Sequence, residues 1–474
     1  MRRANHSRGS LSIICCALAV GLVAAASPAA QASPEHAPHF SPGAPGAGDP
    51  YFPDMGNGGY DVGHYDIRLA FDPTTKAVNA TTTIRARATQ HLSRFDLDFQ
   101  GPLTISKLSV NGRHAAFTRR GAQELVITPP DGLRKGRPFV VSVTYAGVPQ
   151  KIDDPALGVS GWVATKDGAV GLNQPIGAAT YFPVNDTPTD KATYSQTVTV
   201  PSGLTVLANG EPGPTTTHGG RTTFRWHMNR PMASELSMIA IGDYDVTRSV
   251  TDGLLNITAI GKSIDTKPGQ GRVLNRTTAQ IIQWESSNYG RYPFDSTGGI
   301  LADVGVEYAL ETQSRPVYDQ ADSDVDGDLL AHELGHQWFG DSLTPVRWAD
   351  IWLNEGFATY SEWLYQEKFN DVPVRQSFAD TYAAEDDWTG KVADPGRDHI
   401  FDDLVYNRGA MALQALRMKI GDHAFLRMLK LWPTTYRHGN VSTQTFIRFV
   451  ERLTHRDLDA FFHTWLYQPG KPAL

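Results

Sequence analysis

The segment Leu-Leu-Ala-His-Glu-Leu-Gly-His-Gln-Trp-Phe-Gly occupies residues 329–340 and contains the pattern H-E-x-x-H. Its histidines are His332 and His336, and Glu333 follows the first of them. Residues four apart lie on one face of a helix, so both imidazoles can reach one metal ion with the glutamate beside them. The surrounding residues are apolar enough to predict a core helix over 326–339, where two imidazoles and a carboxylate need a compensating interaction. A bound metal supplies that interaction; the alternative is a pair of core histidines hydrogen-bonded to neighbours.

A catalytic zinc site needs a third protein ligand and keeps its fourth position for water. Glu355 is the candidate, within Trp-Leu-Asn-Glu-Gly-Phe-Ala at residues 352–358. The region of Pro345 breaks the first helix, so a second helix over 350–369 can return antiparallel and bring Glu355 to the metal. Two imidazoles and one carboxylate leave the site with a net positive charge, which lowers the pKa of a bound water to about 7. Glu333 is then expected to take the proton of that water and to pass it to the leaving amine.

Further side chains should hold the metal ligands in place. Thr359 and Glu362 fall on the same helical face as Glu355 and are candidates to support it. Asp341 and Asp350 lie nearby in the sequence, and either could orient an imidazole or belong to a surface loop. The sequence does not choose between these two aspartates.

The first 32 residues have the layout of a secretory signal peptide. They combine a basic start, an apolar run from Leu11 to about Ala26, and a small-x-small pattern that ends at Ala32. We therefore predict a secreted protein that is cleaved near Ala32; the alternative is a retained N-terminal anchor. No later stretch approaches the roughly 18 to 20 apolar residues of a membrane span, so no stable membrane association is expected. Both cysteines, Cys15 and Cys16, belong to this leader, and the mature chain therefore has no disulfide.

The charge of the mature chain restricts its partners. Cleavage after the leader leaves 50 acidic and 40 basic residues, a formal net charge of about −10. This balance argues against a nucleic-acid partner, which requires a basic face. The remaining length, over 400 residues, is ample for two or three packed domains.

Three kinds of sequence follow the leader. Residues 33–50 are rich in Pro, Gly, Ala and Ser, which predicts a flexible linker. In residues 51–250 apolar and polar side chains alternate between turns, which predicts an antiparallel, half-buried sheet domain. Residues 251–474 change to helical patterns, among them 271–289 and 408–419, so the predicted fold class is α+β. The alternation is clearest in two runs: Tyr65, Ile67, Leu69 and Phe71 with Asp66 and Arg68 between them, and Phe95, Leu97 and Phe99 with Asp96 and Asp98 between them.

Several of these segments together resemble a known family. Residues 332–341 and 352–358, at this spacing, look like the gluzincin aminopeptidases of the aminopeptidase N and leukotriene-A hydrolase family. The segment Tyr-Phe-Pro-Val-Asn-Asp at 181–186 resembles a pattern of the family's N-terminal β domain. Val-Tyr-Asn-Arg-Gly-Ala at 405–410 resembles the motif that bears its catalytic tyrosine. The resemblance covers nearly all of the mature chain, from about Asp49 onward.

The resemblance implies a fold and a further catalytic residue. It implies a saddle-like β domain over 51–250, followed by a thermolysin-like, mainly helical catalytic domain over 251–474. It also implies that Tyr406 donates a hydrogen bond to the oxyanion of the tetrahedral intermediate, and a preorganised donor of this kind is effective in a dry site. From the sequence alone, a tyrosine placed before a helix is more often a packing residue.

The chain departs from the family pattern at the exopeptidase loop. This loop usually reads Gly-Ala-Met-Glu-Asn, whereas residues 308–312 read Tyr-Ala-Leu-Glu-Thr. The glutamate is retained as Glu311, to which the resemblance assigns the free α-amine of the substrate. Tyr308 replaces the glycine, and Glu307 offers a second carboxylate as the anchor; the alternative is that both glutamates are surface charges. Fuller members continue with a β-sandwich and a helical domain that covers the site, while this chain ends with the catalytic domain.

We therefore expect a zinc metallopeptidase, with an aminopeptidase acting on peptides with free N-termini as the preferred form. Its single zinc ion is assigned to His332, His336 and Glu355, although cobalt or manganese could replace zinc. The first alternative is a zinc endopeptidase with an open cleft. An epoxide hydrolase of the leukotriene type would need a long lipid tunnel. A non-catalytic protein with a structural zinc would need four protein ligands.

Overall fold

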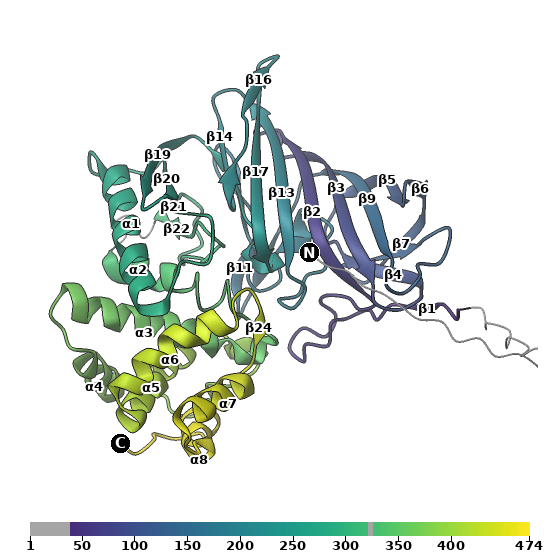
Figure 1. Ribbon diagram of the computed structural model, residues 1–474. Helices are drawn as coiled ribbons and strands as arrows, with labels where there is room; N and C mark the ends of the chain where they lie inside the picture. The colour runs from purple at the N-terminus through teal and green to yellow at the C-terminus, as the bar shows by residue number, and fades with distance from the viewer. Residues whose placement is uncertain (1–37, 321–325) are drawn as a thin grey trace, which may run out of the picture. The chain divides into compact units, whose positions relative to one another are not determined.

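The computed structural model describes residues 38–320 and 326–474. The predicted signal peptide, residues 1–32, lies outside the described residues. From Phe40 to Leu474 the chain forms one unit in which a long series of strands is followed by a region of helices (Figure 1). The predicted α+β class is confirmed. No helix within the two described ranges is long and apolar enough to cross a membrane.

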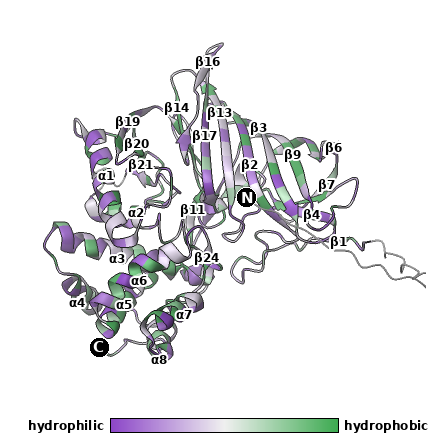
Figure 2. Cartoon of the chain, viewed as in Figure 1, coloured by the Kyte–Doolittle hydropathy of each residue, from purple (hydrophilic) through white to green (hydrophobic). Residues whose placement is uncertain are grey.

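A nine-stranded sheet is the main element of the β domain. In strand β2 (Tyr60–Phe71), Tyr65, Ile67 and Leu69 are buried and Arg68 is exposed, which confirms the predicted alternation. Figure 2 shows hydrophobic and hydrophilic residues alternating along these strands. Most neighbouring strands are antiparallel, as predicted, but β2 and β13 run parallel. In spatial order the strands are β15 (Glu211–Pro212), β17 (Arg221–Met232), β13 (Ala192–Pro201), β2, β3 (Val78–Ala88), β9 (Pro138–Gly147), β5 (Thr104–Val110) and β6 (Arg113–His114), with β16 (Thr216–His218) paired to β17.

Strand β4 (Leu92–Asp98) departs from the predicted alternation, because Asp96 and Asp98 are buried. The Asp98 carboxylate accepts hydrogen bonds from the backbone N–H groups of Gly56 at 3.1 Å and Asp186 at 2.8 Å. Backbone from elsewhere in the chain therefore covers a face that the alternation predicts to be exposed, and it donates to one oxygen of the buried carboxyl, whose pKa burial raises well above its usual range. Two smaller sheets complete the β domain: β1 (Ser41–Pro42), β4, β8 (Glu124–Thr128) and β7 (Ala116–Arg120); and β10 (Lys151–Asp154), β11 (Gly158–Ala164), β12 (Ala169–Leu172), β18 (Ile239–Gly242) and β14 (Thr205–Ala208).

The N-terminal segment, residues 41–55, pairs with strand β4 at its start and is bonded to the helical region through Asp49 and Tyr51. The Asp49 carboxylate accepts the backbone N–H of Trp348 at 2.8 Å, and the Tyr51 hydroxyl donates to Asp394 Oδ1 at 2.7 Å. The flexible linker predicted for residues before 51 is therefore wrong where the chain is described. Specific partners for its backbone and its carboxylate order a stretch whose composition is typical of a linker.

The helical region begins with a four-stranded sheet, β19 (Tyr244–Thr251), β20 (Leu254–Gly261), β21 (Ser296–Ala302) and β22 (Val317–Asp319). Helix α1 (Gln270–Tyr289) ends at Gly290, whose φ of 91° favours glycine, as the sequence predicts. The remaining helices are α2 (Gly327–Gly335), α3 (Trp352–Phe369), α4 (Val374–Ala384), α5 (Asp403–Ile420), α6 (Asp422–Thr435), α7 (Thr443–Thr454) and α8 (Asp459–Phe462); the short strands β23 (Thr344–Pro345) and β24 (Asn440–Val441) pair between them.

Helices α2, α3 and α5 pack in one hydrophobic core, with α3 in contact with both of the others. Helices α3 and α5 approach closely at two glycines. A Cβ added to Gly356 would lie 2.9 Å from the backbone of Gly409. These glycines are next to Glu355 and close to Tyr406 in the sequence, so the tight contact between α3 and α5 holds these two residues near each other.

Candidate active site

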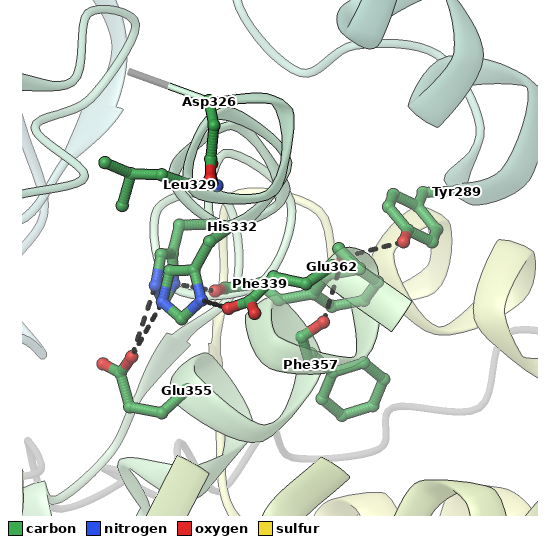
Figure 3. Close-up of polar contacts among 10 residues, drawn as sticks. Tyr289, Asp326, Leu329, His332, Phe339, Glu355, Phe357 and Glu362 are labelled. Carbon is green, nitrogen blue, oxygen red and sulfur yellow. Dashed lines mark hydrogen bonds and ion pairs between the residues drawn. The ribbon is translucent and has the colours of Figure 1, made fainter. Parts of the chain in front are cut away.

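The histidines of the H-E-x-x-H pattern lie at the end of helix α2. This helix is shorter than predicted: the Asp326 side chain caps its start by accepting the Leu329 N–H at 2.9 Å, and the chain turns after His336. His332 and His336 are both buried. The Nε2 atoms of the two rings lie 3.5 and 3.3 Å from one carboxylate oxygen of Glu355, which comes from helix α3 (Figure 3). The structure therefore brings together the three predicted ligands.

The donor set fits a tetrahedral zinc ion. Ligand atoms each about 2.0 Å from such an ion lie about 3.3 Å apart, which matches the two measured distances to Glu355. The nearest ligand atoms of the three residues all lie within 4.8 Å of one another. Two imidazoles and one carboxylate leave a fourth position, as in catalytic zinc sites.

Each imidazole is oriented through its other nitrogen. His332 Nδ1 lies 2.5 Å from Glu362 Oε1, and His336 Nδ1 lies 3.1 Å from the carbonyl oxygen of Phe339 (Figure 3). A proton on each Nδ1 leaves Nε2 free to bind the metal, and such partners are typical of zinc-binding histidines. Glu362 was predicted on the correct helical face but as a support for Glu355, so its role as a histidine partner was missed.

The two aspartates considered for this role lie elsewhere. Asp350 accepts hydrogen bonds from the N–H and hydroxyl of Thr443, the first residue of helix α7, at 3.0 and 2.6 Å. Asp341 is buried, and its carboxylate has no hydrogen-bond partner among the residues that the structure describes. Neither orients a histidine, and the alternative of a surface loop is also wrong for Asp341. The hydroxyl of Thr359 likewise has no partner in the described chain and does not support Glu355.

Glu333 lies beside the metal ligands without belonging to them. It is buried, and its Oε2 has no hydrogen-bond partner in the described part of the chain. Burial raises the pKa of Glu333 to about 8, while the imidazoles of His332 and His336 act in the opposite direction. A carboxylate with a raised pKa is suited to take up and release a proton near neutral pH.

Tyr406 lies against the metal cluster. The sequence suggested that Tyr406 precedes the helix. Helix α5 instead begins at Asp403, so Tyr406 belongs to its first turn. Its ring stacks on that of His332, with centroids 6.0 Å apart and an angle of 18° between the planes. Burial, aided by the charge of Glu355, raises the pKa of Tyr406 well above its usual range, so its hydroxyl stays a donor at neutral pH.

Glu311 lies beside Glu333 and His336. It is 3% exposed, and its carboxylate, that of Glu333 and a ring nitrogen of His336 lie within 4.8 Å of one another. Gln174 of the β domain donates from Nε2 to Glu311 Oε1 at 2.6 Å. Glu307, by contrast, is exposed.

A cavity of about 440 Å³ lies next to these groups. Gln174, Glu307, Tyr308 and Tyr406 are among its lining residues, with Leu157 and Phe401 on its apolar walls. The Tyr308 hydroxyl donates to the carbonyl oxygen of Val159 in strand β11, which fixes the side chain that replaces the family's glycine. The cavity therefore has apolar walls and reaches Tyr406 and Gln174, the hydrogen-bond partner of Glu311.

Models of two known protein domains match this chain. Residues 62–236 match the peptidase M1 N-terminal domain, and residues 315–465 match the peptidase family M1 domain. The second match contains the histidines, Glu355 and Tyr406. Together the two matches reach from the main sheet of the β domain to the last helices.

Curated proteins and solved structures give similar matches. Aminopeptidase N of Lactobacillus delbrueckii subsp. lactis is 26% identical over 87% of this chain and 51% of its own length. Leucyl aminopeptidase of Saccharolobus solfataricus is 24% identical over 87% of this chain and 54% of its own length. The chain thus spans about half the length of these relatives.

A solved structure matches over almost its whole length. The M1 zinc metallopeptidase of Deinococcus radiodurans superposes with a TM-score of 0.83 and 30% sequence identity, covering 90% of this chain and 98% of that one. A mutant of that enzyme has been solved with a Tyr-Ser-Ala substrate, again with a TM-score of 0.83.

Proposed function

This chain belongs to peptidase family M1, and from that premise we propose that it is an aminopeptidase that holds one zinc ion and removes N-terminal residues from peptides. The observation that carries the proposal is the position of Glu311. Its buried carboxylate lies within 4.8 Å of Glu333 and His336, next to the expected position of the scissile bond. A fixed negative charge there suits the ammonium group of a peptide whose first residue is to be removed.

Different residues bind the metal, transfer the proton and stabilise the developing negative charge. His332, His336 and Glu355 would hold the zinc ion, which when bound would supply Lewis-acid chemistry for activating water and polarising the scissile carbonyl. Glu333 takes a proton from the attacking water and delivers it to the leaving amine. Tyr406 donates a hydrogen bond to the substrate's carbonyl oxygen as negative charge develops on it.

Glu311 limits how far the substrate enters. A free α-amine at its carboxylate forms a charged hydrogen bond worth about 1.5 to 3 kcal/mol. A blocked or internal amide cannot form this bond, and it leaves a buried carboxylate without its partner. Gln174, by donating to Glu311 Oε1, holds one oxygen in place and leaves the second for the substrate. This arrangement disfavours the endopeptidase alternative.

The test compares two glutamates on a free and an N-acetylated form of one peptide, with and without a chelator. We expect Glu311→Ala to cut cleavage of the free peptide by about 10- to 100-fold and to narrow its advantage over the acetylated peptide. Glu307→Ala is the comparison, because Glu307 is exposed and lines the cavity but lies outside the cluster of Glu311, Glu333 and His336. If Glu307→Ala has the larger effect, Glu307 is the anchor. If the wild-type enzyme cleaves both peptides equally well inside the chain, it is an endopeptidase.

We also propose that residues 1–32 are a signal peptide cleaved near Ala32, and that the mature enzyme is secreted. The basic start, the apolar run and the small-x-small pattern support this proposal. The experiment is to express the full chain in a secreting host and to determine the N-terminal sequence of the protein in the medium. An uncleaved, cell-associated product would contradict it.

A further inference from the structure

Gln337 follows His336 directly and connects the metal-binding segment to the loop that carries Glu311. Its side chain is fully buried. Its amide nitrogen donates to the carbonyl oxygen of Glu311 at 3.3 Å. Its amide oxygen accepts the backbone N–H of Ser314 at 2.7 Å and the hydroxyl of Tyr292 at 3.3 Å. One side chain thus uses both ends of its amide, and two of its three hydrogen bonds go to the backbone of the Glu311 loop.

The loop needs such support because its conformation is unusual. Residues 311–315 are all buried, and Ser314 has a φ of 69°, in the left-handed region that non-glycine residues rarely adopt. The hydrogen bond from the Ser314 N–H to Gln337 joins this strained residue to the metal segment. A strained backbone persists only where its surroundings hold it.

The β domain holds the same loop from another side. Asn209 Nδ2 donates to the carbonyl oxygen of Gln313 at 2.8 Å, and the N–H of Gly210 donates to Ser314 Oγ at 2.8 Å. The Arg315 guanidinium, itself fully buried, donates to the carbonyl oxygen of Ala208 on strand β14 of the β domain, and also to that of Ile257 on strand β20 of the helical region. The loop is therefore held by two sets of hydrogen bonds. Gln337 provides the set that connects the loop to the segment of His332 and His336.

We infer that Gln337 is a positioning residue that sets the distance between the Glu311 carboxylate and the metal cluster, and so enforces the preference for free N-termini. The inference rests on the proposed aminopeptidase function and adds a residue to it. Loss of the Gln337 amide leaves the Ser314 N–H and the Glu311 carbonyl without partners in a buried place, so the loop is expected to move. A displacement of about 1 Å at a substrate-positioning group can cost about 100-fold in rate.

The experiment compares Gln337→Met with a matched control, Gln313→Met. Methionine has nearly the volume of glutamine but removes the amide. Gln313 is also fully buried and lies on the same loop, but its amide nitrogen donates to Pro231 and does not contact Glu311. Zinc content is measured for each purified variant, together with kcat and KM for a free and an N-acetylated version of one peptide.

We expect Gln337→Met to retain its zinc, to raise KM for the free peptide, and to narrow the ratio of kcat/KM between the free and acetylated peptides by at least about 10-fold. Gln313→Met should keep the wild-type ratio. The inference would be overturned if Gln337→Met kept the wild-type ratio of kcat/KM between the free and acetylated peptides, whether or not it lost zinc. An equal narrowing of that ratio in Gln313→Met would also overturn it. A wild-type enzyme without any preference for the free peptide would instead refute the proposed function.

Gln337→Asn covers the case in which the methionine variant does not fold. Asparagine keeps the amide but is one methylene shorter, so it cannot reach both Glu311 and Ser314 from the same backbone position. We expect Gln337→Asn, like Gln337→Met, to narrow the ratio of kcat/KM between the free and acetylated peptides. A folded Gln337→Asn enzyme with the wild-type ratio would overturn the inference.

Discussion

Removal of the Glu362 carboxylate should weaken zinc binding without abolishing it. Glu362 Oε1 lies 2.5 Å from His332 Nδ1, so Glu362→Ala frees one imidazole to rotate and to change its protonated nitrogen. The Glu362 side chain is 32% exposed, so solvent screens the ion-pair part of the interaction and the orienting hydrogen bond is the larger loss. The second imidazole keeps its partner, because the carbonyl oxygen of Phe339 belongs to the backbone. We therefore expect a 10- to 100-fold rise in the zinc dissociation constant, about 1.4 to 2.7 kcal/mol.

The assay is a competition between the enzyme and a zinc chelator of known affinity, followed by atomic absorption of the protein fraction. Glu367→Ala is the control, because Glu367 lies on the same helix α3, is exposed and does not touch His332. Glu362→Gln should lose less than Glu362→Ala, since the glutamine oxygen still accepts the Nδ1 proton. Wild-type zinc affinity in Glu362→Ala, or an equal loss in Glu367→Ala, would refute the reasoning.

Four further predictions concern the catalytic residues and the buried charges. Glu333→Gln should keep its zinc and lose about 10² to 10⁴ in kcat, as metal analysis and kinetics will show; loss of zinc would make Glu333 a ligand. Glu355→Ala should lose most of its zinc on dialysis, and full retention would mean that another residue is the third ligand. Tyr406→Phe should lower kcat, with a rise in the activation free energy of at most roughly 3 to 4 kcal/mol and little change in KM. An effect on KM alone would mean that Tyr406 only shapes the pocket. Burial raises the pKa of Asp190 to about 7 in the folded protein, whereas its unfolded pKa is about 3.9. The protonated Asp190 therefore contributes fully to the free energy of unfolding below about pH 3.9, and this contribution is lost as the pH rises through 7. Asp190→Asn should therefore gain stability relative to the wild type between pH 5 and pH 8, by up to about 2 kcal/mol in denaturant unfolding, and a difference that does not vary with pH would contradict this.

The residues of the candidate metal site could be predicted from the sequence because their arrangement is mostly local. Two histidines four residues apart share a helical face whatever the rest of the fold does, and this fixed His332 and His336 as a pair. Glu355 needed only one more assumption, a second helix after the break near Pro345. The same reasoning placed Glu362 on the correct face of that helix, but the atom that it contacts depends on how α2 and α3 pack, which no local pattern encodes.

Contacts between distant segments could not be predicted. Gln174 and Glu311 are 137 residues apart and come from different domains, and their hydrogen bond exists only because the β domain packs beside the Glu311 loop. Asp98 was predicted to be exposed because alternation describes one strand and does not say what covers its other face. The backbone of Gly56 and Asp186 covers it. Local periodicity predicts which elements form, whereas the partners of buried polar groups follow from the tertiary packing.

The attachment of the N-terminal segment has a consequence for the order of folding. Asp49 and Tyr51 emerge early from the ribosome, but their partners Trp348 and Asp394 follow 299 and 343 residues later. At about 5 to 20 residues per second, the segment waits roughly 15 to 70 seconds for them. Contacts between residues so far apart also carry a large loop-closure entropy, so they are expected to form after the local sheets and helices. Asp49 and Tyr51 thus take their places against the helical region only after the C-terminal half has been made.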